Sequence, residues 1–305
     1  MKLGIKFGPR KESIANLEDT NAEFVEVWFR IDKLDTYQPY FQYFKEHRIP
    51  AGLHFWGLTQ DGYLPSIVHP DMAFRTESMD LIKKTIDIAA LHHFVYVNIH
   101  PGHRAKVALN FDTQTYGTPK DIIDQRQADK IYQETSQKLA SFALSQGVLL
   151  TVETTTPRAM SDFYNPKMEE TRKTPLQMYE YALTVLNASQ IHTFIANDFG
   201  HTAASLITSE RDKIWQFLRS KTVEFAPKTK LLHVGYIVPP YNGTDFHDHL
   251  DNPVFATNRA VPNRSETIEL LRLFIQRPDV FALVEPMNGH PKNYRLLRQL
   301  AEEVR

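Results

Sequence analysis

The chain has 305 residues, of which 42% are hydrophobic and 23% are charged, and its 35 Lys and Arg nearly balance its 36 Asp and Glu. These values exclude a disordered chain, because the apolar side chains are numerous enough to offset the entropy lost on folding. The absence of cysteine excludes disulfides, iron–sulfur clusters and thiol nucleophiles, so any metal site must use His, Asp and Glu.

Short apolar segments recur along the whole chain. Most are apolar throughout, as expected of strands that are covered on both faces. The predicted strands are residues 3–7, 24–29, 51–56, 94–100, 148–153, 193–198, 230–236 and 280–285.

Segments with helical periodicity lie between these strands. The predicted helices are residues 10–18, 37–47, 76–93, 123–146, one opening at Thr174-Pro175, one holding Ile214, one capped by Ser265 and one beginning at Pro291. Alternating strands and helices over this length predict a single (β/α)8 barrel domain spanning residues 1–305. The rival, an open doubly wound sheet, usually carries a Gly-rich phosphate loop, and the sequence contains no such motif.

Acidic and histidine side chains stand at or just after the ends of the later strands. In a barrel these ends meet at one mouth, where active sites lie. The residues are His54, His100, Glu153, Asp198, His201, His233, Asp245, His247 and Glu285. Burying so many unpaired charges is costly, and a bound cation removes that cost. Carboxylates mixed with imidazoles predict a divalent metal, with Zn²⁺ favoured and Mn²⁺ or Fe²⁺ as alternatives.

The order of these residues resembles that of a known family. Glu153, then Asp198-x-x-His201, then His233 and Glu285 are arranged as in the xylose isomerase-like TIM-barrel superfamily, also called AP endonuclease family 2. The resemblance implies a barrel in which Glu153, Asp198, His233 and Glu285 hold a common metal ion.

The remaining residues resemble endonuclease IV in particular. His54, His100-Pro101-Gly102, His201 and Asp245-Phe246-His247 match the additional ligand motifs of its trinuclear zinc cluster. This resemblance implies phosphoester hydrolysis, with Glu153 bridging two ions. The sequence departs from endonuclease IV beside Glu153, Asp198 and His233, and its net charge of −1 gives no basic surplus. DNA is therefore a less favoured substrate than a small phosphoester.

A second hypothesis needs only one metal ion. In a sugar or sugar-phosphate isomerase or epimerase, Glu153 and Glu285 would move a proton at the carbon next to a carbonyl, and His201 would orient the sugar. The other His and Asp residues would then bind substrate. A non-catalytic binding barrel fits so many metal-competent side chains less well.

Other residues beside the strand ends are candidates for substrate binding. Trp56 and Tyr236 can stack on a sugar or base, and His103 and Arg104 follow the His100 motif and can meet a hydroxyl or a phosphate. The first residues show no apolar segment of secretory length, and no apolar run approaches about 20 residues, so we expect a cytoplasmic protein.

Overall fold

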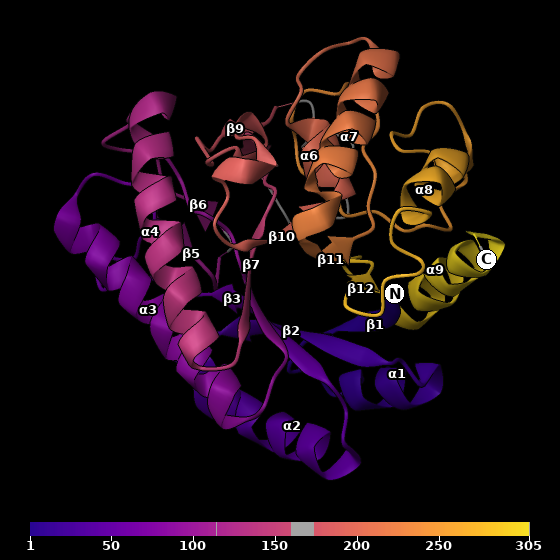
Figure 1. Ribbon diagram of the computed structural model, residues 1–305, viewed down its shortest axis with the longest axis horizontal. Coiled ribbons are helices and arrows are strands. Elements are labelled where there is room, and N and C mark those ends of the chain that lie inside the picture. Colours follow the sequence, from indigo (N-terminus) through magenta and orange to yellow (C-terminus); the bar gives the residue numbers. More distant parts are fainter. Residues whose placement is uncertain (114, 160–173, 305) are drawn as a thin grey trace.

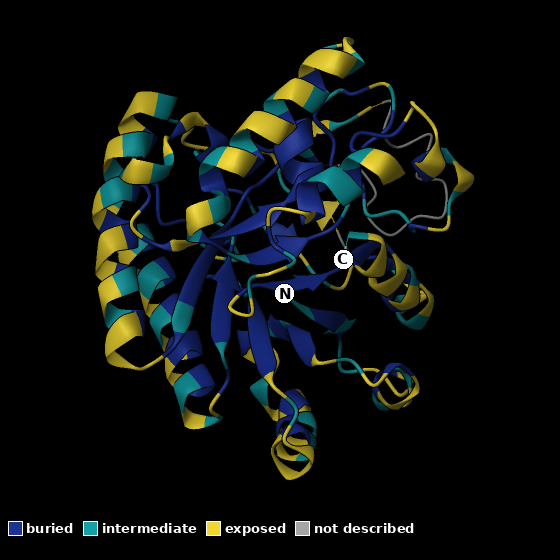
Figure 2. Cartoon of the chain, turned by 45° about the vertical axis from the view of Figure 1, so that its right-hand side comes forward, coloured by how far each residue is buried: buried dark blue, intermediate teal, exposed yellow. Residues whose placement is uncertain are grey.

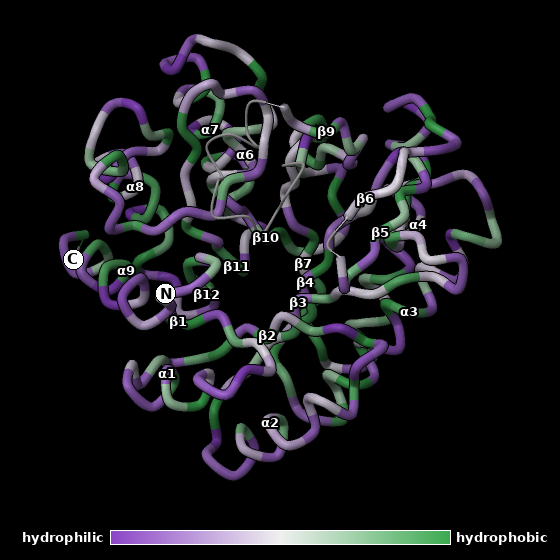
Figure 3. Tube along the Cα trace, turned by 180° about the vertical axis from the view of Figure 1, so that it is seen from behind, coloured by the Kyte–Doolittle hydropathy of each residue, from purple (hydrophilic) through white to green (hydrophobic). Residues whose placement is uncertain are grey.

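The computed structural model describes residues 1–113, 115–159 and 174–304. Parallel strands close into a barrel in the order β1-β12-β11-β10-β7-β4-β3-β2, and Figure 3 shows them arranged around the barrel axis. Their bounds are β1 (Lys2–Phe7), β2 (Phe24–Arg30), β3 (Ala51–Trp56), β4 (Tyr96–Ile99), β7 (Leu149–Glu153), β10 (Phe194–Asp198), β11 (Thr229–His233) and β12 (Phe281–Leu283). The predicted (β/α)8 barrel is confirmed.

Helices surround the barrel and cover the outer faces of the strands (Figure 1). They are α1 (Ser13–Thr20), α2 (Leu34–His47), α3 (Met72–Leu91), α4 (Gln125–Ser145), α6 (Phe199–Ala204), α7 (Arg211–Phe225), α8 (Arg264–Leu271) and α9 (His290–Val304). Figure 2 shows their exposed residues facing outward and the buried strands inside. Within the described residues, no helix is long and apolar enough to cross a membrane.

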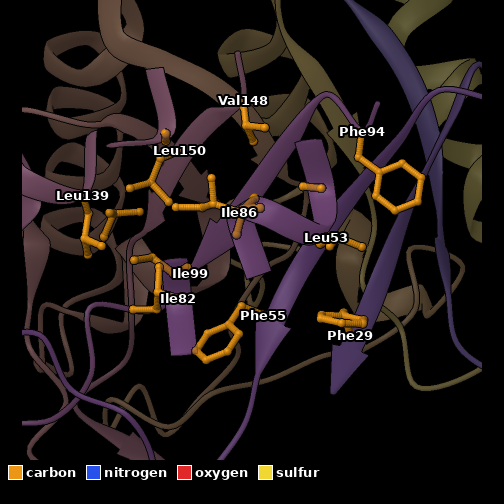
Figure 4. Packing of buried hydrophobic residues seen from close by; sticks show 14 of the residues in the cluster. Phe29, Leu53, Phe55, Ile82, Ile86, Phe94, Ile99, Leu139, Val148 and Leu150 are labelled. Atoms are coloured by element: carbon orange, nitrogen blue, oxygen red, sulfur yellow. The ribbon is translucent and has the colours of Figure 1, made fainter. Parts of the chain in front are cut away.

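The main core lies between strands and helices. Outward-pointing Leu53 and Leu150 of the barrel are packed in one cluster with Ile82 and Ile86 of α3 and with Leu139 of α4 (Figure 4). All of these side chains are buried. Because alternate residues of a strand point to opposite faces, the other half of each strand is left to fill the barrel interior.

An apolar layer fills the amino end of the barrel interior. It consists of Phe24, Tyr96, Ala196, Leu231, Phe281 and Leu283. Gly4 and Gly52 make room for its rings, since a Cβ at Gly4 would lie 2.3 Å from the Phe24 ring and one at Gly52 would lie 2.2 Å from the Tyr96 ring. The polar side chains therefore gather at the carboxyl end.

Two pairs of short antiparallel strands, with the described loops beside them, build a wall above that end. β5 (Leu109–Asn110) pairs with β6 (Thr115–Tyr116), and β8 (Arg158–Ala159) pairs with β9 (Leu176–Gln177). A separate apolar cluster holds these loops together, consisting of Leu64, Ala105, Val107, Leu109, Ala159 and Met178. The wall has its own small core, so it forms a defined boundary beside the mouth.

The prediction of a helix that begins at Thr174-Pro175 is wrong. Residues 176–177 form β9, and a short 3-10 turn covers Leu183–Val185. The backbone of this segment hydrogen-bonds to other loops, with Tyr181 N–H donating to Gly102 O at 2.9 Å. These long-range bonds outweigh the local helical preference. The capping residue of α8 also differs, because Asn263 rather than Ser265 accepts from the backbone.

Candidate metal centre

Strand register sets the level at which polar side chains enter the barrel. Lys6 of β1 lies beside Glu26 of β2, and Asp198 of β10 lies beside His233 of β11. His54 of β3 lies beside Asn98 of β4. Because residues at matched register on neighbouring parallel strands share one face, the members of each pair point into the barrel interior. Contacts between the pairs, such as Lys6 Nζ to His54 Nδ1 at 2.7 Å, join them into one polar layer.

All of the metal ligands predicted from the sequence come together at this layer. Among the described residues, four groups each bring ligand atoms within 4.8 Å of one another. The groups are Glu153–Asp198–His233–Glu285, His54–His100–Glu153, His201–Asp245–His247 and Glu26–His54–His233–Glu285.

The first group centres on the Nδ1 atom of His233. This atom lies 3.2 Å from Glu153 Oε1, 3.1 Å from Glu285 Oε2 and 3.9 Å from Asp198 Oδ2. Glu153 and His233 are buried. Three carboxylates and one imidazole nitrogen thus converge from β7, β10 and β11 and from the segment just after β12.

The other two predicted groups are held mainly by contacts among protein side chains. His100 is fixed by Glu180, whose Oε1 lies 2.7 Å from its Nδ1. Asp245 lies between two imidazoles, with Oδ1 3.0 Å from His201 Nε2 and Oδ2 3.0 Å from His247 Nε2. The His201–Asp245–His247 group therefore satisfies much of its own bonding capacity, whereas His54 Nε2 and Glu153 Oε1 in the other group have no hydrogen-bond partner.

Buried polar atoms without a hydrogen bond show that the first group fits a cation. Glu153 Oε1 and His233 Nδ1 are both buried and have no hydrogen-bond partner. Buried polar atoms are almost always hydrogen-bonded, so two such atoms that face each other point to an additional partner. A carboxylate oxygen and a neutral imidazole nitrogen are ligands for Zn²⁺ and Mn²⁺, and no sulfur competes.

The charges of the centre compensate one another. Burial opposes ionisation of Glu153, but the imidazoles of His233 and His54 outweigh it and lower the pKa of Glu153 well below its ordinary value. Burial likewise opposes protonation of His233, but Glu153 and Glu285 raise the pKa of His233 well above its ordinary value. The pKa of His201 is also raised, against burial, by Asp198 and Asp245. Without a metal ion, protonated imidazoles balance the carboxylates.

These pKa shifts predict that metal binding becomes stronger as the pH rises. A ligating imidazole must be neutral, and the raised pKa of His233 extends its protonated form to higher pH in the metal-free protein. Binding then releases protons, and raising the pH removes this competition. Zinc titration calorimetry in buffers of different ionisation enthalpy should detect the released protons. An affinity that stays constant from about pH 6 to pH 9 would contradict this assignment.

A cavity of about 380 Å³ opens above the centre. Its described lining includes His54, His100, His201, Asp245, His247 and Glu285, and aromatic side chains form one side, namely Trp28, Trp56, Phe111 and Tyr116. The rings of Trp28 and Trp56 lie 6.2 Å apart. Cavities of this size and mixed character bind small molecules.

Two of the predicted substrate-binding residues reach this cavity. Trp56 and His103 line it, and the Nε1 atom of Trp56 and the Nδ1 atom of His103 are buried without a hydrogen-bond partner. Arg104 and Tyr236 are not among its described lining residues. Arg104 instead donates to Ile123 O at 2.6 Å, and the Tyr236 hydroxyl donates to Asp248 at 3.1 Å.

The structure adds charged residues that the sequence analysis missed. Lys6 and Glu26 stand inside the barrel, and Lys6 Nζ lies 2.5 Å from Glu26 Oε1 and also contacts Glu285. Asn98 Nδ2 donates to Glu153 Oε2 at 2.5 Å. A signal was available, because both Lys6 and Glu26 interrupt strands that are otherwise apolar.

No family model matches the sequence, and no curated protein matches it either. Solved structures do resemble the chain over its length. A D-tagatose 3-epimerase-like protein has a TM-score of 0.58 at 12% identity, covering 100% of this chain and 98% of its own.

Two further structures represent two activities. An L-ribulose 3-epimerase has a TM-score of 0.60 at 14% identity, covering 99% of this chain and 94% of its own. Endonuclease IV from Thermus thermophilus has a TM-score of 0.50 at 12% identity, covering 99% of this chain and 100% of its own. At the level of the fold, the chain is a (β/α)8 TIM barrel that resembles these structures over its length.

Proposed function

We propose that this protein is a divalent-metal-dependent sugar epimerase or isomerase that uses one metal ion. The observation that carries the proposal is the convergence of Glu153 and Glu285 with His233 Nδ1 in the first group. Glu285 also lines the cavity, so this carboxylate meets a bound ligand directly. Two carboxylates beside one metal site are suited to moving a proton at a carbon next to a carbonyl.

The contacts of His54 favour one metal ion over three. Its Nδ1 atom lies 2.7 Å from the Lys6 ammonium, which has only donors, and 3.2 Å from Glu285 Oε1. The shorter contact favours the tautomer in which Nδ1 accepts and Nε2, 3.5 Å from Glu153, carries the proton. A nitrogen that keeps its proton is not a metal ligand.

The cavity also supports a sugar. Indole and phenyl rings stack on the apolar faces of pyranose and furanose rings, and Trp28, Trp56 and Phe111 provide such a wall. The unpaired Nε1 of Trp56 and Nδ1 of His103 offer partners for hydroxyl groups. The structural neighbours described as 3-epimerases fit this interpretation.

Each residue of the centre then has a role. Glu153, Asp198, His233 and Glu285 would hold the metal ion, which would supply polarisation of the substrate carbonyl and its neighbouring hydroxyl. Glu153 and Glu285 would take the proton from the adjacent carbon and return it. Asp245 holds His201 at 3.0 Å, so the imidazole would be oriented to donate to a substrate oxygen.

The test is a panel of ketoses in heavy water with the metal-replete protein. We expect an epimer or isomer to form and deuterium to enter the carbon next to the carbonyl, both followed by NMR. Cleavage of a duplex with an abasic site, with no deuterium exchange in any sugar, would overturn the proposal.

A second candidate is phosphoester hydrolysis at a trinuclear site. One observation favours it, because the ligands expected from the endonuclease IV resemblance fall into three of the four groups found here. Neighbouring metal ions can activate water and stabilise a leaving oxygen. The number of bound metal ions separates the two candidates.

A further inference from the structure

Glu26 is a buried carboxylate that belongs to none of the expected motifs. It lies on β2, with no exposed surface, below the centre. A carboxylate at such a position is costly unless all of its oxygens are paired. Its partners therefore show what the residue does.

Glu26 is held from two sides by donors. The Lys6 ammonium donates to Oε1 at 2.5 Å, and the Tyr96 hydroxyl donates to Oε2 at 2.9 Å. The position of Lys6 follows from strand register, because Lys6 on β1 lies beside Glu26 on β2. These bonds fix the carboxylate within the barrel.

Glu26 also faces two imidazoles: His54 Nδ1 lies 3.5 Å from Oε1, and His233 lies closer. The Nε2 atom of His233 lies 3.0 Å from Glu26 Oε1 and 3.3 Å from Oε2. An ionised carboxylate only accepts, so His233 must carry a proton on Nε2 and donate it. In the neutral imidazole, Nδ1 then keeps its lone pair, and Nδ1 is the unpaired atom that faces Glu153 and Glu285.

We infer that Glu26 is a positioning residue that fixes the tautomer and ring orientation of His233 for metal binding through Nδ1. The inference rests on the metal site of the proposed function. Carboxylates behind a ligating imidazole raise its basicity and hold its ring, and their loss typically lowers metal affinity 10–100-fold. Lys6 and Tyr96 hold Glu26 in place, and Lys6 also contacts Glu285.

The first measurement uses the zinc-loaded wild-type protein. Histidine labelled with ¹⁵N shows, through two-bond ¹H–¹⁵N correlations, which ring nitrogen carries a proton, and His233→Gln identifies the signals. We expect His233 to be protonated on Nε2 and bound through Nδ1. Binding through Nε2 would overturn the role of Glu26 while leaving the metal site intact. Absence of zinc binding by the wild type would overturn both.

The second measurement is zinc affinity, determined by competition with a chelator. We expect Glu26→Gln to weaken binding 10–100-fold and to change the visible spectrum of the cobalt-substituted protein, because the amide cannot accept from all three donors. Glu266→Gln is the matched control, since Glu266 is paired with Arg211 at 2.6 Å away from the centre. The control should bind zinc within about twofold of wild type. Equal affinity of Glu26→Gln and wild type would overturn the inference.

Discussion

Glu153→Gln should abolish turnover and lower the metal content of the purified protein, while the barrel remains folded. Glu153 is buried at the meeting point of two of the ligand groups, with His233 Nδ1 3.2 Å from Oε1 and His54 Nε2 3.5 Å from Oε2. An amide has neither the charge that a cation needs nor the basicity that proton transfer needs.

We expect the loss in kcat to reach at least about 10²–10⁴-fold, the usual contribution of a general acid–base. The fold should survive because the surrounding imidazoles can release protons and so remove the uncompensated positive charge. Elemental analysis, circular dichroism and turnover would be measured on wild type, Glu153→Gln and the Glu266→Gln control. A Glu153→Gln variant with full metal content and full turnover would show that Glu153 is not a ligand.

The protein should bind one metal ion per chain, and the double variant Asp245→Ala/His247→Ala should keep it. Asp245 already bridges His201 and His247 at 3.0 Å on each side. This group is therefore satisfied by its own hydrogen bonds, unlike Glu153 Oε1 and His233 Nδ1, which have no hydrogen-bond partner.

The same double variant should raise KM for the sugar, because both residues line the cavity and would contact substrate hydroxyls. Loss of a hydrogen bond of this kind costs about 0.5–1.5 kcal/mol, which corresponds to a few-fold to about tenfold change per contact. A content near three ions that falls by one in the variant would instead establish the trinuclear site and favour phosphoester hydrolysis. Metal content would be measured on fully replete protein prepared without chelator.

The residues of the candidate metal centre could be predicted from the sequence because barrel topology converts chain order into position. His54, Glu153, Asp198 and His233 lie within apolar strands, and Glu285 follows one, so each had to appear at the mouth once the strands closed. The alternation of strands and helices is a local pattern. This pattern depends on side chains close in the sequence, and the strands it predicts form the closed barrel.

Other features depended on contacts that no local pattern encodes. The segment that begins at Thr174 does not form the predicted helix, because its backbone hydrogen-bonds to the loops around Gly102 and Pro157. Arg104 follows the His100 motif, yet its side chain bonds to the Ile123 carbonyl rather than facing the cavity. Loop conformation of this kind follows from packing between distant segments.

The sequence by itself determined the barrel and the acidic and histidine side chains at its mouth, since strand periodicity and strand-end residues are local properties. Only the tertiary structure decided which of these side chains contact one another. Lys6 and Glu26 read as isolated charges in two apolar strands, and register places them beside each other, beneath His233 and Glu285. A buried charge is tolerated only with its partners in place, and two of those partners, Glu285 for Lys6 and His233 for Glu26, lie more than 200 residues away along the chain.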